Sequence, residues 1–287
     1  MHQIFTAIFE PGFFASAQVH VAVTIGGIVA VVSAIVGVFT VMRGQSFGGH
    51  ALGDVSAAGG SGALLIGLSP IAGFVGLGIV GAGVMDLIGV QRVRGRDLAT
   101  GIVLGVATGL SALFLYLDTT THALTGATQQ ILFGSIFTVD PSTVPVVAVC
   151  ASLTLAVVAF IYRPLLLSSV STETAAARGV PVRLVGSLFI VTLAVAVGLS
   201  ALAIGAILST ALLIGPAASA LPLTRRVGPA VAVAVVLGVG TTWLGIAVSY
   251  DSYYWTSSHK ALPVSFCIVA IVVVVYLASR LVAAMRR

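Results

Sequence analysis

Two ionisable side chains, His50 and Asp54, stand inside a long apolar part of the chain, in the stretch 46-SFGGHALGDVSAAGG-60. Residues four apart stack on one helix face, with Cβ atoms about 5–6 Å apart, so both could reach one ion. Imidazole and carboxylate together suit Zn²⁺, Mn²⁺ or Fe²⁺ better than alkali ions. The pair therefore indicates a cation site, although two ligands are too few for a specific one. The alternative is a neutral, hydrogen-bonded His–Asp pair that holds two helices together.

The composition indicates which class of protein carries this pair. Of 287 residues, 59% are hydrophobic and 7% are charged, and the mean hydropathy is +1.18. Soluble domains carry roughly 25% charged residues. Apolar runs of about 20 residues, each long enough to cross ~30 Å of hydrocarbon, recur along the chain. We therefore expect an all-α, polytopic transmembrane bundle in a lipid bilayer. A barrel would need short alternating strands instead.

The apolar runs predict nine membrane spans. Their approximate ranges are 16–42, 46–68, 70–90, 97–117, 142–162, 183–203, 205–222, 228–249 and 261–284. Eight spans are the alternative, if two neighbouring runs form one crossing. With nine spans and the N-terminus outside, every arginine falls on the cytoplasmic side, as arginines of membrane proteins do. The C-terminus is then cytoplasmic. No linker or shift in composition divides the chain, so we expect a single transmembrane domain over 1–287.

The formal net charge of +5 does not indicate nucleic-acid binding, because the cations are scattered over loops. One segment, 128-TQQILFGSIFTVDP-141, does not fit a crossing. We expect it to form a short half-helix or re-entrant piece on the outer side, packed against protein.

Several motifs are missing, and their absence narrows the function. The chain contains a single lysine and no G-x-x-x-x-G-K-[ST] loop to cradle a nucleotide. It also lacks an H-E-x-x-H motif and a G-x-S-x-G nucleophile elbow. These absences favour a transporter over an enzyme. Its energy would come from an ion gradient or from ATP hydrolysed by a separate subunit.

The loop 171-STETAAARGVPVR-183 predicts a short cytoplasmic helix. Ser171 or Thr172 can cap its N-terminus, and Glu173 lies in the first turn, where the helix dipole favours an anion. Gly179 can supply the left-handed residue that ends a helix, and Pro181 prevents continuation. The loop is either an ordinary connector or a rigid helix that contacts an ATPase subunit.

Four stretches together resemble the permease subunits of ABC importers for manganese, zinc and iron. They are 42-MRGQSFGGHALGDVSAAGG-60, 101-GIVLGVATGLSALFL-115, 172-TETAAARGVPV-182 and 205-GAILSTALLIGPAASAL-221. The first is similar to a family segment with a carboxylate and an imidazole after an arginine-containing turn. One departure concerns the order: the family's commoner arrangement is Asp first and His four residues later, and here His50 precedes Asp54. The resemblance covers most of the chain in the expected order.

The resemblance implies an ATP-driven importer of a divalent transition metal in the bacterial cytoplasmic membrane. A second permease copy, identical or closely related, would double the ligand set to two His50 and two Asp54. Cytoplasmic ABC ATPase subunits would grip the 172–178 helix, and an extracytoplasmic metal-binding protein would deliver the ion. The residues that the resemblance places at the ATPase contact are Ser171, Thr172, Glu173, Ala176 and Gly179. No permanently bound cofactor is implied, because the metal is cargo and ATP binds the partner.

Four further residues are weaker candidates at the outer mouth: Asp118, His122, Asp251 and His259. They could guide a cation or contact a binding protein, and solvated loop residues are the alternative. Two rival functions also stay open. One is a secondary transporter that uses His50 and Asp54 as a proton relay. The other is an ABC permease for a chelated metal or siderophore, whose wider path would not need these ligands. His and Asp accept all three metals, so these residues do not select among them.

Overall fold

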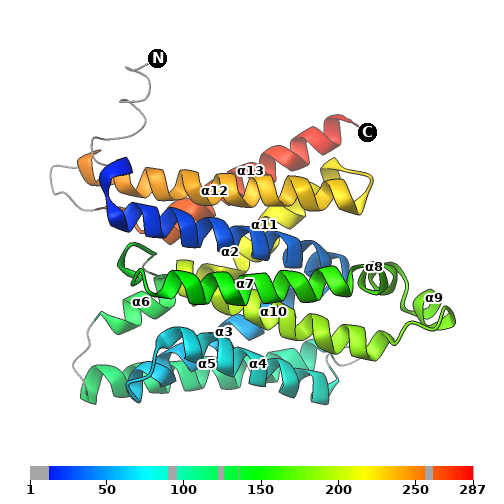
Figure 1. The fold of residues 1–287 in the computed structure, drawn as a ribbon, viewed down its shortest axis with the longest axis horizontal. Helices are drawn as coiled ribbons and strands as arrows, with labels where there is room; N and C mark the ends of the chain where they lie inside the picture. Colours follow the sequence, from blue (N-terminus) through cyan, green and yellow to red (C-terminus); the bar gives the residue numbers. More distant parts are fainter. Residues whose placement is uncertain (1–12, 90–95, 122–125, 135, 256–260, 287) are drawn as a thin grey trace.

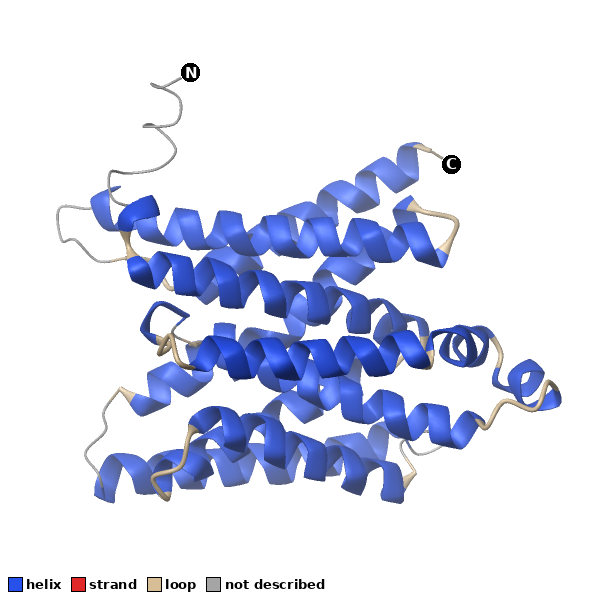
Figure 2. Cartoon of the chain, viewed as in Figure 1, coloured by secondary structure: helices blue, strands red, loops and turns tan. Residues whose placement is uncertain are grey.

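The structure is a computed structural model that describes residues 13–89, 96–121, 126–134, 136–255 and 261–286. All regular structure in these ranges is helical (Figure 2). The long helices are α2 (Ala17–Met42), α3 (Ser46–Leu65), α4 (Pro70–Ile88), α5 (Arg96–Thr121), α7 (Thr143–Phe160), α10 (Val182–Ile204), α11 (Ala206–Ala220), α12 (Val227–Trp255) and α13 (Val264–Met285). The short elements are η1 (Phe13–Ala15), α6 (Ala127–Phe133), η2 (Ile136–Thr138), α8 (Tyr162–Val170), α9 (Thr172–Ala177) and η3 (Leu221–Leu223).

The helical membrane bundle expected from the sequence is confirmed. Eight of the described helices are long and apolar enough to cross a bilayer. The expected span at 46–68 corresponds to α3, a 20-residue helix that is not among those eight. Its mean hydropathy is lower than theirs because it contains many Gly and Ser residues together with His50 and Asp54. Neighbouring helices shield it instead, since α3 packs against α4, α5, α10 and α11.

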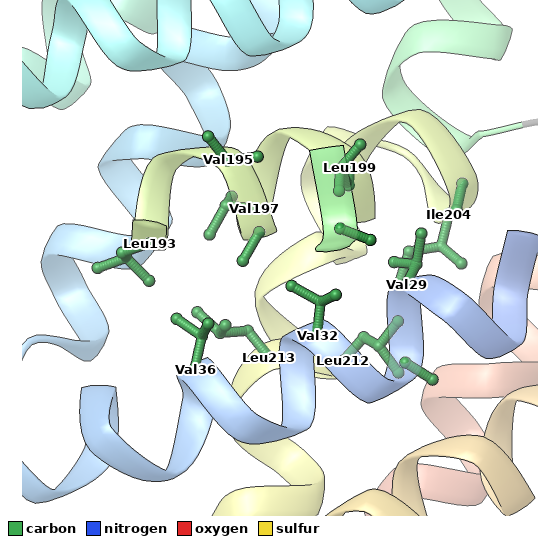
Figure 3. Packing of buried hydrophobic residues seen from close by; sticks show 14 of the residues in the cluster. Val29, Val32, Val36, Leu193, Val195, Val197, Leu199, Ile204, Leu212 and Leu213 are labelled. Atoms are coloured by element: carbon green, nitrogen blue, oxygen red, sulfur yellow. The ribbon is translucent and has the colours of Figure 1, made fainter. Parts of the chain in front are cut away.

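The hydrophobic core is formed mainly by α2, α10 and α11. Aliphatic side chains from the three helices interdigitate (Figure 3). Val29 and Val36 of α2, Leu193 of α10 and Leu213 of α11 are all 1% exposed or less. Burying a side chain of this size contributes about 1.5–3 kcal/mol relative to leaving it exposed. This core is the scaffold against which α3 is held.

Small residues let α3 enter the bundle closely. The tightest approach joins Gly59 to Gly73 of α4, where a Cβ added at either glycine would overlap the backbone carbonyl of the other. Membrane helices commonly use small residues for such close contacts, because apolar burial cannot hold them together in lipid. The glycine-rich sequence around His50 and Asp54 therefore has a packing role.

Gly59→Ala tests this packing. An alanine in a helix interior is normally favoured over glycine by about 1 kcal/mol. Here the added methyl group must displace the α4 backbone, and such overpacking costs about 1–3 kcal/mol. We expect the thermal unfolding midpoint in detergent to fall. The control is Gly76→Ala on α4, whose Cβ would meet nothing within 4 Å. A Gly59→Ala protein that melts at or above the wild-type temperature would refute the close contact.

The segment 128–141, which was predicted not to cross the membrane, is broken into two short helices, α6 and η2. Ile131 of α6 and Ile136 of η2 are buried at 3% and 1% exposure, so the segment packs against protein as expected. Gly134 separates the two pieces with a φ of 72°, a left-handed conformation that favours glycine. Figure 1 places α6 at one end of the bundle and α8 and α9 at the other.

Candidate metal-pathway site

His50 and Asp54 lie on an open strip of α3, a helix whose middle part is otherwise buried. From Gly48 to Ser61, only these two residues of α3 are not buried. Phe47, one turn before His50, continues the strip and is 42% exposed. The spacing of three and four residues places all three side chains on the same helix face. The polar pair is therefore partly accessible, with His50 bonded to α11 and Asp54 bonded to α5.

Threonines from two other helices orient the pair. The Nδ1 atom of His50 lies 3.1 Å from Oγ1 of Thr210 on α11. The hydroxyl of Thr108 on α5 donates to Oδ2 of Asp54 at 2.6 Å. Hydrogen bonds of this kind fix the ring and carboxylate orientation of metal ligands. Neither threonine was expected from the sequence, although each is a hydroxyl in the middle of an apolar run.

His50 and Asp54 do not form the direct hydrogen bond that a neutral His–Asp pair would require. Among the described residues, no hydrogen bond links His50 to Asp54. The second ring nitrogen of His50, Nε2, and the second carboxylate oxygen of Asp54, Oδ1, take no part in the bonds to the threonines. When Nδ1 of His50 carries the proton and donates to Thr210, Nε2 keeps a lone pair for an ion, and Oδ1 of Asp54 is available in the same way.

His50 and Asp54 have no third acidic, imidazole or thiol ligand beside them among the described residues. Within the described ranges, no three His, Cys, Asp or Glu side chains gather closely enough to hold a metal. Divalent transition metals bind four or more ligands in stable protein sites. An ion held by His50 and Asp54 would need further ligands, such as hydroxyl or carbonyl oxygens, water or groups of a second chain.

Sequence comparison decides the family. Residues 16–283 match the ABC 3 transport family. The chain belongs to this family. Within it, the chain is 29% identical over 232 residues to the manganese transport system membrane protein MntC of Halalkalibacterium halodurans, covering 80% of this chain and 78% of that one. It is 28% identical over 232 residues to the chelated iron transport system membrane protein YfeC of Yersinia pestis, covering 80% and 76%.

The fold is shared with a solved structure, PsaBC from Streptococcus pneumoniae in complex with Fab. The TM-score is 0.80 at 23% identity, over 97% of this chain and 95% of that chain. At this level of identity the match concerns the arrangement of the helices alone. The resemblance to metal-importer permeases is confirmed by the family match and by the manganese and iron transport relatives.

The outer-mouth candidates of this ABC 3 family member require a correction. Asp118 is 0% exposed and Asp251 is 8% exposed, so neither is a solvated loop residue. The reason is that α5 continues to Thr121 and α12 to Trp255, beyond the spans predicted at 97–117 and 228–249. Apolar runs mark only the part of a helix that lies in hydrocarbon. The other two candidates, His122 and His259, lie outside the described residues.

The short helix predicted in the 171–183 loop is confirmed as α9. The Ser171 hydroxyl accepts a hydrogen bond from the backbone N–H of Thr174 at 3.2 Å. At the other end, the Gly179 N–H donates to Ala176 and the Val180 N–H to Ala175, which is a complete Schellman motif. Gly179 has the required φ of 77°. Caps at both ends make six residues a rigid unit.

The residues predicted to contact an ATPase subunit are therefore held together on α9. Thr172, Glu173 and Ala177 are exposed, and Gly179 is exposed directly after the helix. Ala175 is buried and Ala176 is exposed, so α9 packs against protein on its Ala175 side and leaves Ala176 accessible. In Figure 1, α9 extends beyond the ends of the neighbouring long helices. This exposed position makes α9 accessible to a partner protein.

Proposed function

We propose that the chain is the membrane-spanning subunit of an ATP-driven importer that moves a bare divalent transition-metal ion, such as Mn²⁺, across a bacterial cytoplasmic membrane. The observation that carries this proposal is the open strip of α3, where an oriented imidazole and carboxylate each keep a free donor atom. The names of the relatives support it, because MntC belongs to a manganese transport system.

A second copy of the chain would cover the open strip. A charged or strongly polar group at depth in hydrocarbon costs several kcal/mol unless it faces a partner or a water-filled path. Asp54 and its partner Thr108 lie on the outward side of α3 and α5, where Thr108 itself is exposed. Facing lipid would leave this carboxylate without compensation. A symmetric partner would place two such faces against each other and enclose a polar path.

The adjacent face of α5 is suited to such a contact. Gly101, Gly105 and Gly109 follow each other at four-residue intervals, and a Cβ at any of them would meet nothing within 4 Å of this subunit. Small residues at this spacing let two membrane helices approach closely. Thr108, three residues after Gly105, lies on the same side of α5. The glycines thus lie beside the hydrogen-bonded carboxylate that needs covering.

Pairing supplies the missing ligands. Two His50 and two Asp54 would line the path on either side of the symmetry axis, giving two nitrogen and two carboxylate donors. An ion that crosses needs sites strong enough to replace its hydration and weak enough to release it. A coordination shell made partly of these side chains and partly of water can both bind and release the ion. The chain itself performs no covalent chemistry in this mechanism.

Conformational changes driven by ATP hydrolysis in the partner subunit would be transmitted to the ion path through α9. The capped helix fits a groove of a cytoplasmic ATPase subunit, with Thr172 and Glu173 at its exposed start. The arginine distribution supports an orientation with the N-terminus outside, where a metal-binding protein would deliver the ion. The chain would alternate between two conformations of similar energy as the ATPase subunits close and open.

The name of one relative favours a second cargo, because YfeC belongs to a chelated iron transport system. A chelated ion brings its own ligands and would not need His50 or Asp54 to shed them. The oriented pair favours the bare ion. The two cargoes separate experimentally, since loss of the pair should stop transport of free Mn²⁺ and spare transport of a chelate.

The experiment that tests the function is uptake by sealed vesicles containing the chain and its ATPase subunit. We expect Mn²⁺ uptake that requires ATP inside the ATPase-facing compartment and a metal-loaded binding protein on the other side. Vesicles with the chain alone and an imposed proton gradient form the second arm. Uptake in that arm without the ATPase would overturn the proposal in favour of a proton-coupled transporter.

A further inference from the structure

Arg43 stands in the short turn that leads into the helix of the metal-pathway site. It is the C-terminal cap of α2, and α3 begins three residues later at Ser46. The backbone of this turn is tightly bonded, with the Gln45 N–H donating to Thr40 at 2.9 Å and the Gly49 N–H donating to Gln45 at 2.9 Å. A displacement of the turn is therefore passed to the first turns of α3, which carry His50.

The Arg43 side chain reaches away from its own turn to the helix that precedes α9. Its Nη1 donates to the hydroxyl of Ser168 on α8 at 3.0 Å, and Ser168 is only 3% exposed. Its guanidinium carbon lies 5.4 Å from the centre of the Phe189 ring on α10. A planar guanidinium can donate in its plane and stack on a ring at the same time, which a lysine cannot do.

Helix α8 is in turn fixed to α9. The Ser171 backbone N–H donates to the Leu167 carbonyl at the end of α8 at 3.0 Å, and the Ser171 hydroxyl caps α9. Only this one residue separates the two helices. A displacement of α9 is therefore transmitted to α8, because the one-residue linker is too short to bend independently.

A second contact between α2 and α8 is of a different kind. Phe39 of α2 meets Tyr162 at the start of α8 edge to face, with ring centres 5.9 Å apart. Aromatic contacts of this kind permit sliding over a range of geometries. A hydrogen bond weakens steeply when its distance or angle changes. The Arg43–Ser168 bond is therefore the contact that fixes the register between α8 and the turn.

We propose that Arg43 is a positioning residue that makes α8, α9 and the start of α3 move as one body, so that displacement of α9 by an ATPase subunit re-aims His50. The inference rests on the proposed function for its biological meaning. Its mechanical part concerns this chain alone. A half-buried cation is an expensive way to fill space, because apolar residues of similar volume are often as stable or more so.

The first test uses the purified full chain without any partner, in lipid nanodiscs. Arg43→Met keeps much of the side-chain volume and removes the charge and donors. Ser168→Ala removes the acceptor and leaves Arg43 intact. We expect amide hydrogen exchange in residues 46–53 to rise at least about fivefold in both variants, the lower range of coupling between sites. Exchange that changes only around residues 43–45 and in α8 would show a local packing role and overturn the inference.

The second test measures Mn²⁺ transported per ATP hydrolysed in vesicles containing the ATPase subunit. In complexes with Arg43→Met or Ser168→Ala, we expect ATP hydrolysis to continue while this ratio falls at least about fivefold. The ratio for Arg43→Lys should lie between those of these two variants and the wild type. The control is Arg280→Ala on α13, an exposed arginine that should leave the ratio unchanged.

The outcomes separate the two proposals. A wild-type complex that transports with ATP, together with an unchanged ratio in both variants, would reject the link and leave the function standing. A wild-type complex that shows no ATP-driven transport would reject the function. The exchange measurement would then still decide whether Arg43 joins the two segments, because it needs no partner. If Arg43→Met does not fold, Ser168→Ala alone decides both tests.

Discussion

Asp54→Asn should abolish uptake of free Mn²⁺ while the protein folds normally. The amide oxygen of asparagine can still accept the hydrogen bond that Thr108 donates at 2.6 Å, so α3 and α5 stay joined. What is lost is the negative charge and a strong oxygen ligand for the ion. Removing residues that merely orient a ligand typically costs 10–100-fold in metal affinity or activity, and the ligand itself should cost at least about 100-fold. The measurement is initial ATP-driven uptake in vesicles.

Controls separate the ion path from general damage. Asp86→Asn changes another carboxylate of a membrane helix, one that accepts a hydrogen bond from Ser187 at 2.6 Å. It lies outside the proposed path and should keep most of the uptake. Thr108→Val should lower uptake by roughly tenfold, because it releases Asp54 without removing it. Wild-type uptake in Asp54→Asn, or equal losses in Asp54→Asn and Asp86→Asn, would remove Asp54 from the path.

Gly105→Leu should prevent two subunits from pairing and thereby stop transport. Within one subunit a Cβ at this position would meet nothing within 4 Å, so the chain should fold and melt like the wild type. A second α5 or α3 packed against this face would meet the leucine directly. The expected result is a change from dimer to monomer in light scattering of the detergent-solubilised protein, with uptake lost.

The matched control is Gly240→Leu on α12. This glycine also has nothing within 4 Å of its Cβ, and α12 lies across the bundle from α5 in Figure 1. We expect this variant to stay dimeric and to transport. A dimer that survives Gly105→Leu and dissociates in Gly240→Leu would move the interface to the other side of the bundle.

The features that the sequence predicted best depend on local interactions. Ser171 and Gly179 bracket α9 as expected, because capping and positive φ are properties of a few adjacent residues. The helical strip that joins His50 to Asp54 follows likewise from their four-residue spacing. The break in the 128–141 segment was also predictable, since its polar residues and glycine do not suit a crossing.

Features that depend on distant parts of the chain were not predictable. Thr108 lies 54 positions from Asp54, and Thr210 lies 160 positions from His50. Nothing in the spacing along the chain brings these groups together. Asp118 and Asp251 were misplaced for a related reason, because polar helix ends that pack against other helices read as loops when only hydropathy is considered. The threonine contacts and the burial of these two aspartates both result from tertiary packing.

The account depends on His50 and Asp54 facing a shared ion between two subunits. Mn²⁺ is paramagnetic, so pulsed EPR of the purified complex can detect nitrogen bound directly to it. We predict one Mn²⁺ for every two permease chains and a ¹⁴N coupling that disappears in His50→Gln. Mn²⁺ bound without nitrogen, or bound equally well after His50→Gln, would contradict the account.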